Sequence, residues 1–199
     1  MANAPFGLQP VRNAGAGPDL PTRMYRVTTT GNTFGIFIGD PVRFNPSGLG
    51  VIRMSANVAP NTRCLGVVAQ LFDTNGRPLT FNQPTRGPFL PAATAGWAAV
   101  YDQQNITFIC QVDASAAESM VGQYVTLTAA NNGGNTAAGT SIMQISQASV
   151  DTSVKTFQVV GISPTESQGL GSFAGAAGWG AATNIDLEVR IALHSLTTT

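Results

Sequence analysis

The end of the chain alternates apolar and polar residues with a period of two, which fits a strand and does not fit a helix. Between residues 185 and 194 the apolar positions are Ile185, Leu187, Val189, Ile191 and Leu193. The positions between them are Asp186, Glu188, Arg190, Ala192 and His194. Because successive side chains of a strand point to opposite faces, this segment predicts a strand with one face in the core and one polar face.

Residues 105–112 show a second alternating pattern, with one side formed by Ile106, Phe108, Cys110 and Val112. Ile109 lies on the other side, which indicates that both faces are covered. From Arg23 onward, short runs rich in Val, Ile, Phe, Thr and Tyr are separated by Gly, Pro, Asn and Asp, and they predict further strands at 24–29, 34–38, 42–44, 51–54, 64–72, 98–101, 124–127, 142–145 and 156–162. About ten short strands at this spacing predict a mainly β protein, a compact sandwich or barrel.

Two local motifs predict how some of these strands are connected. Residues 73–76, Asp-Thr-Asn-Gly, predict a hairpin turn, because Asn-Gly readily adopts positive φ angles. A calcium loop is the alternative, but Pro84 stands where such a loop has its bidentate Glu. Ser115 and Glu118 have the spacing of a capping box, so we expect one or two helical turns before Gly122 stops them, and at most one short helix in the chain.

The first part of the chain predicts an extended arm outside the core. Its prolines remove backbone donors and disfavour helix, and they stand at Pro5, Pro10, Pro18 and Pro21. Glycines at positions 7, 15 and 17 add flexibility. We therefore divide the chain into an extended N-terminal arm over residues 1–22 and a single β domain over residues 23–199.

Isolated apolar side chains on this arm are predicted to lie against a surface. Phe6, Leu8 and Val11 are the apolar anchors, and Arg12 is their polar complement. The surface belongs either to another molecule or to the arm's own subunit or a trimer mate. A glycine-rich loop at residues 169–182 carries Phe173 and Trp179, which either tuck back onto the core or insert into a neighbour.

Composition indicates a surface that packs against other protein. Charged residues make up 10% of the 199 residues and the formal net charge is zero, whereas typical soluble proteins have about 25% charged residues. A solvated surface rich in Thr and Asn is the alternative. The basic residues are scattered singly, so nucleic-acid binding is not expected. No signal peptide or membrane span is recognisable, and we expect a soluble protein that is not exported.

The residue types needed for catalysis are scarce, and we predict no catalytic, metal or cofactor site and no enzymatic activity. His194 is the single histidine and is expected to make a surface or interface hydrogen bond. Cys64 and Cys110 have no CxxC partner and predict buried thiols, with a disulfide as the alternative. Asp186 and Glu188 share a strand face and could act as a carboxylate pair, but Arg190 follows on that face and is expected to pair with Glu188.

Several short motifs together resemble a virion protein of tailed bacteriophages. They are NAPFGLQPVR at the start, FIGDPVRF, CLGVVAQLFD, NGRPLTFNQP, VYDQQNITFICQVD and the final strand ending in IALHSL. The resemblance spans most of the chain. It departs from the family at residues 102–105, where relatives often have an acidic turn, and at Cys110, which replaces an acidic residue.

The resemblance implies a head decoration or cement protein without enzymatic activity. Such a protein forms a β-rich domain, a homotrimer, that binds the major capsid protein on the surface of the assembled head and stabilises it. It would be assembled in the host cytoplasm and located in the virion. We expect its interface to be formed by Pro5, Phe6, Leu8, Val11, Arg12, Phe173 and Trp179. The alternative within the virion is a fibre or tail component that binds a host surface, and a plain soluble β domain also remains open.

Overall fold

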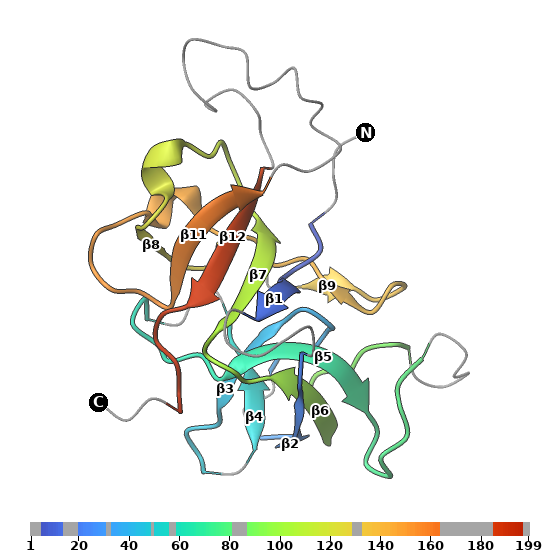
Figure 1. Cartoon of the computed structure of the whole chain (residues 1–199). Helices are drawn as coiled ribbons and strands as arrows, with labels where there is room; N and C mark the ends of the chain where they lie inside the picture. The colour runs from blue at the N-terminus through green and yellow to red at the C-terminus, as the bar shows by residue number, and fades with distance from the viewer. Residues whose placement is uncertain are drawn as a thin grey trace.

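A computed structural model describes residues 5–13, 20–30, 33–48, 50–55, 59–80, 87–128, 133–163 and 185–196. The chain is mainly β, with several sheets and a small closed barrel, as the sequence predicts. Figure 1 shows the two main assemblies of strands, a five-stranded sheet above and the barrel below. A two-stranded ribbon, β9 (Gly134–Asn135) with β10 (Thr140–Ser141), lies beside them.

The five-stranded sheet has the order β1-β7-β12-β11-β8, and every neighbouring pair in it is antiparallel. Its strands are β1 (Gln9–Asn13), β7 (Ile106–Gln111), β12 (Asp186–Ile191), β11 (Phe157–Ser163) and β8 (Tyr124–Val125). β1 and β8 are the two edges. The alternation predicted for β12 is confirmed on its apolar side, because Ile185, Leu187, Val189 and Ile191 are all buried. The side predicted to be polar is exposed only in part, since Asp186 is buried as well.

The barrel closes in the order β2-β4-β3-β5-β6. Its strands are β2 (Arg23–Val27), β3 (Pro41–Phe44), β4 (Val51–Arg53), β5 (Gly66–Phe72) and β6 (Gly96–Tyr101). β2 and β4 are parallel and meet at Val27 and Val51, whereas the other contacts are antiparallel. The barrel thus lies between β1 and β7 in the sequence.

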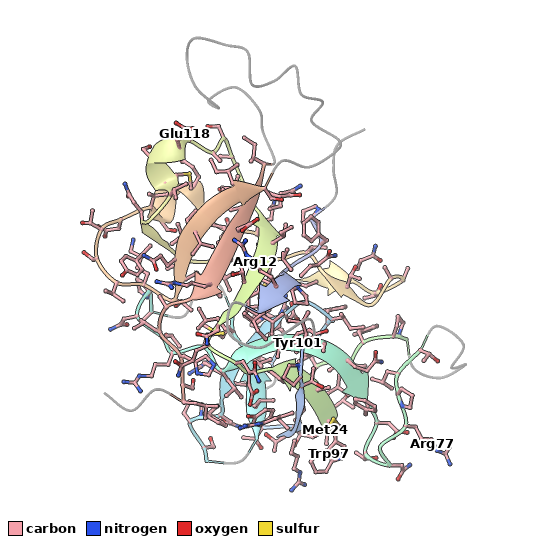
Figure 2. All side chains as sticks on the ribbon, viewed as in Figure 1. Arg12, Met24, Arg77, Trp97, Tyr101 and Glu118 are labelled. Carbon is pink, nitrogen blue, oxygen red and sulfur yellow. The ribbon has the colours of Figure 1, made fainter. Side chains whose placement is uncertain are left out.

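Each assembly has its own apolar core, and the two cores meet at the junction. Val42, Leu65, Leu71 and other inward side chains fill the barrel. Met54, Cys64 and Val67, which lie in or beside barrel strands, pack instead with the core of the sheet. Figure 2 shows Tyr101 between the two assemblies, and Met24 and Trp97 close together on the barrel, away from the sheet.

Most of the predicted strands are present, and two are wrong. Residues 34–38 and 142–145 form isolated bridges and no strand, through Ile36, Ile38 and Ile145. Ile36, Phe37, Met143 and Ile145 are buried although they belong to no strand, so burial without strand pairing contributed to the pattern on which the predictions rested. The short apolar run is therefore a weaker signal than the long alternation of β12.

The helix prediction is also corrected. The described residues contain two single-turn 3-10 helices, η1 (Glu118–Met120) and η2 (Gln147–Ser149), where at most one short helix was expected. Ala117 is the N-cap of η1 and makes no side-chain cap hydrogen bond, so the predicted capping box does not form. Gly122 does follow η1 with a φ of 87°.

The predicted hairpin turn and buried thiols are confirmed. Asp73 Oδ1 accepts hydrogen bonds from the backbone N–H groups of Asn75 and Arg77, and Gly76 has a φ of 77°. Cys64 and Cys110 are both free and fully buried. Burial raises the pKa of the Cys64 thiol to about 12, which makes it an unreactive core residue.

Candidate functional site

The described part of the N-terminal arm belongs to the β domain. β1 pairs with β7 along Gln9–Asn13, and the Leu8 side chain is only 1% exposed in the core of the sheet. The expectation that Leu8 anchors the chain to another molecule is therefore wrong, because its apolar surface is already covered by its own subunit. Residues 5–13 of the predicted arm thus pack on the β domain.

Val11 is an exposed apolar side chain on this strand, at the position of a β-bulge. β1 and β7 are in register at Pro10 with Phe108 and again at Arg12 with Thr107, so Val11 is an extra residue without a partner. Its side chain is 43% exposed. A bulge and a proline both weaken the ability of an edge strand to pair further, so β1 presents side chains to solvent and not a free hydrogen-bonding edge.

Two glycines allow the arm to approach the barrel closely. Gly7 and Gly39 have φ angles of 75° and 88°, and the Leu8 N–H donates to the Gly39 carbonyl at 2.9 Å. A Cβ atom at Gly7 would lie 2.4 Å from the Ser141 Cβ and 2.8 Å from the Gly39 oxygen. No larger residue fits at Gly7 without movement of the backbone, so the contact between arm and barrel depends on this glycine.

A small groove remains where the arm crosses the junction. It has a volume of about 100 Å³ and is lined by both the arm and the barrel, notably by Phe6, Pro10, Ile38, Val68 and Tyr101. Phe6 is half-buried at this groove. Its neighbour in the chain, Pro5, is also half-buried. For the proposal below, we call three arm side chains that lie outside the core the arm surface: Phe6, Val11 and Arg12.

A buried ion pair lies next to the arm. Asp40 Oδ2 is 2.8 Å from Arg53 Nε, and both side chains are almost completely buried. Asp40 also accepts a hydrogen bond from the Phe37 N–H at 2.8 Å. Burial raises the pKa of Asp40 to about 6 against the opposing effect of Arg53, and burial lowers the pKa of Arg53 against the opposing effect of Asp40.

The arginine of this pair ties the ribbon of β9 and β10 to the barrel. Its Nη2 donates to the Gly133 carbonyl at 2.7 Å, and its guanidinium lies 5.7 Å from the centre of the Phe37 ring. Phe37 stacks on Phe89 with ring centres 4.9 Å apart. The ion pair and its contacts thus join the segments that contain Phe37, Arg53, Phe89 and Gly133. These segments lie next to the arm.

Arg12 completes the attachment of the arm. Its Nη2 is 2.7 Å from Glu188 Oε2 on β12. The expected pair between Arg190 and Glu188 is therefore wrong, because Arg12 takes that carboxylate and Arg190 turns to Gln158 instead. Arg12 is largely exposed, so the pair contributes little to stability.

The structure brings Pro5, Phe6, Leu8, Val11 and Arg12 together on one short segment, but they do not form one surface. Leu8 points into the core, whereas Val11 and Arg12 are exposed. The two other predicted interface residues, Phe173 and Trp179, lie outside the described residues.

No protein-family model, curated protein or solved structure matches this chain. In the part of the chain that the structure describes, there is no cluster of three or more His, Cys, Asp or Glu side chains that could hold a metal ion. Among the same residues, no helix is long and apolar enough to cross a membrane.

His194 is buried, and its expected position on the polar face of a strand is wrong. β12 ends at Ile191, and His194 lies beyond it, 3% exposed, at a bridge with Cys64. Its Nδ1 accepts the Leu196 N–H at 3.1 Å, and burial lowers its pKa although the charge of Asp102 opposes this. Asp102 accepts a hydrogen bond from the Tyr25 hydroxyl at 2.6 Å. The neutral imidazole is therefore part of a buried network and does not line the arm groove.

Asp186 is a further buried carboxylate, besides Asp40 and Asp102. It is 2% exposed, and no described residue donates a hydrogen bond to its Oδ1. Burial raises its pKa to about 6. On the neighbouring strand, the Cys110 thiol has a raised pKa, chiefly through burial and further through the charge of Asp186.

We expect Asp186→Asn to stabilise the protein at pH 8 by about 2 to 3 kcal/mol, which corresponds to a pKa shift of roughly two units. A raised pKa means that the folded state binds the proton more tightly, so the contribution of Asp186 is favourable below about pH 4 and is lost as pH rises through about 6. Urea unfolding at pH 4 and pH 8 measures the difference between variant and parent. Glu118→Gln, at an exposed carboxylate, is the control. A gain that is equal at both pH values would contradict this origin.

Sequence reasoning missed the residues that hold the arm, namely Asp40, Arg53, Gly7 and Gly39. Only one signal for them was available: Asp40 is a single charge inside the apolar run FIGDPV. A lone charge in such a run is either exposed at a turn or paired in the core, and the sequence does not name the partner.

Proposed function

We propose that this chain is a non-enzymatic virion structural protein, a decoration or cement protein that binds the major capsid protein on the assembled head and stabilises it. The family resemblance of the sequence motifs supports this function. The observation in the structure that supports it best is the exposed Val11 at the bulge in β1.

The arm surface is the part of the protein that we assign to the capsid. Phe6 contributes from the groove, Val11 from the bulge and Arg12 from the exposed face, where its bond to Glu188 can be exchanged for a carboxylate of the partner. Because Pro10 and the bulge weaken the free edge of β1, the contact is made by side chains and not by an added strand.

One arm surface alone binds the capsid weakly, and the proposed homotrimer supplies three arm surfaces that together bind firmly. Complete burial of one valine contributes about 1.5 to 3 kcal/mol at most, which is small beside the cost of bringing two proteins together. Three copies of the surface bound to a repeating capsid lattice gain from effective concentration, by a factor of about 10² to 10⁴. The low charge of the chain also favours close packing against other protein.

The test is Val11→Asp, with Val121→Asp as its matched control. The two valines are 43% and 44% exposed, and Val121 is the C-cap of η1 and not part of the arm surface. We expect Val11→Asp to fold normally and to lose at least about tenfold in binding to heads that lack the protein, because a charge replaces the apolar contact. Co-sedimentation with such heads measures the bound fraction.

Normal incorporation of Val11→Asp would refute the docking role of the arm surface, and so would an equal loss for Val121→Asp. A point variant is preferable to deletion of residues 2–12. That deletion would also remove β1 and Leu8 from the folded domain, and loss of binding would then follow from unfolding.

A further inference from the structure

A polar pocket opens on the five-stranded sheet, on the side of the edge strand β8. Its volume is about 240 Å³, and its main polar groups come from Gln104, Asn105, Tyr124, Gln158 and Arg190. They are three amides, one phenol and one guanidinium, and no carboxylate is among the lining residues. The pocket therefore has one fixed positive charge and several neutral hydrogen-bonding groups.

The strand register places three of these residues in one row. Tyr124 on β8 lies opposite Gln158 on β11, and Gln158 lies opposite Arg190 on β12. The row continues through Thr107 on β7 to Arg12 on β1, so it crosses the whole sheet. Since directly opposite residues project from the same face, the pocket groups are held side by side by the sheet itself.

Arg190 is oriented without being neutralised. Its Nε and Nη2 donate to Gln158 Oε1 at 2.9 and 2.6 Å, and Gln158 Nε2 donates to the Gly122 carbonyl at 3.0 Å. The carboxylate two positions away on the same face, Glu188, is bound by Arg12 at 2.7 Å. Among the described residues no carboxylate pairs with Arg190, so its guanidinium is available to an external anion.

We propose that this pocket binds an acidic sugar, that is, a single sugar ring that has a carboxylate. Arg190 would bind the carboxylate, because charged hydrogen bonds to a guanidinium are the strongest that the pocket offers. The amides and the Tyr124 hydroxyl would bind ring hydroxyls, which both donate and accept. The volume lies below the roughly 300 to 1,000 Å³ of pockets for drug-sized ligands, which limits the ligand to about one ring.

The composition of the pocket argues against an acidic peptide segment as the ligand. Peptide and protein contacts obtain most of their binding energy from apolar anchors in desolvated pockets, and the apolar lining here is confined to small or aliphatic groups such as Val154 at the rim of a polar surface. The net charge of the chain is zero, so the carboxylate is attracted by Arg190 itself and not by a general positive field.

The test is a titration of the full chain, followed by amide resonances in two-dimensional NMR, with glucuronate, glucose and N-acetylglutamate as probes. We expect glucuronate to shift the signals of Tyr124, Gln158 and Arg190 with a Kd of about 1 mM, as befits a ligand of this size. Glucose lacks the carboxylate and N-acetylglutamate lacks the ring hydroxyls, so both should bind at least about tenfold more weakly.

Two variants test whether glucuronate binds in this pocket and not elsewhere on the surface. Arg190→Gln removes the charge, and Gln158→Glu neutralises it in place with almost the same shape; each should weaken glucuronate binding at least about tenfold. Arg77→Gln is the matched control, because Arg77 lies on the exposed hairpin after β5 and projects away from the sheet (Figure 2). It should leave binding unchanged.

The proposal is overturned if glucuronate gives no shifts at tens of millimolar, if glucose or N-acetylglutamate binds as tightly, or if both pocket variants bind like the parent. It is independent of the capsid docking proposed above. Arg190→Gln should still bind heads normally, and Val11→Asp should still bind glucuronate, so each proposal can fail alone.

Discussion

Leu8→Ala should lower the free energy of unfolding by about 3 kcal/mol. Leu8 is 1% exposed within the core of the sheet, and removal of a buried leucine side chain costs about 2 to 5 kcal/mol through lost burial and the cavity left behind. Urea unfolding followed by circular dichroism measures it directly.

Val11→Ala is the control for this prediction. Val11 is three residues further along the same segment and is exposed, so its loss should change the free energy of unfolding by less than about 0.5 kcal/mol. If Leu8→Ala were as harmless as Val11→Ala, the arm would not occupy its position on the sheet in solution. It would then be an extended segment outside the core, as the sequence alone predicts.

Arg53→Met should lower the free energy of unfolding by about 3 to 5 kcal/mol at pH 8. The substitution leaves the Asp40 carboxylate buried without its cation, which is the costly way to break a buried pair. It also removes the hydrogen bond to the Gly133 carbonyl. Chemical unfolding at pH 8, with Arg26→Met at an exposed position of β2 as the control, measures the loss.

The loss of unfolding free energy in Arg53→Met should be smaller at pH 5 than at pH 8, because Asp40 can take up a proton at the lower pH. Its pKa is already raised to about 6 by burial, and without Arg53 it rises further, so the carboxyl binds a proton and becomes neutral as pH falls. The double variant Asp40→Asn, Arg53→Met should recover much of the stability at pH 8, since no unpaired charge remains. An equal loss at pH 5 and pH 8 would show that the buried carboxylate is not the cause.

The sequence is most informative where a pattern is long and local. The alternation from Ile185 onward predicts both the strand β12 and its buried face, and the Asp-Thr-Asn-Gly turn at residues 73–76 predicts the hairpin after β5. Both signals depend on neighbours in the chain, on the period of a strand in one case and on the φ angles of a turn in the other. Neither requires knowledge of the partner strand.

The sequence is least informative about which distant segments meet. Arg190 and Glu188 share a face of β12, and a local argument pairs them, but Arg12 is brought to Glu188 by the pairing of β1 with β7. The pair of Asp40 with Arg53 likewise depends on the antiparallel contact of β3 with β4. A period of two says which way a side chain points and nothing about what lies beside it.

The candidate site was predicted in part for this same reason. Isolated apolar residues on a segment rich in proline correctly suggest side chains that lie against a surface, as Leu8 does. The pattern does not say whose surface it is. The distinction between Leu8 and Val11 depends on one extra residue in β1, and a bulge of one residue has no signature in composition or spacing.

The place of the barrel between β1 and β7 also determines the order in which the chain is completed during synthesis. β1 leaves the ribosome before the barrel strands, yet it can pair only after all five of them and then β7 have been made. At about 5 to 20 residues per second, this delay lasts roughly 5 to 20 s. Throughout that interval Leu8 has no core to enter, so the nascent protein exposes an apolar side chain that the finished protein buries.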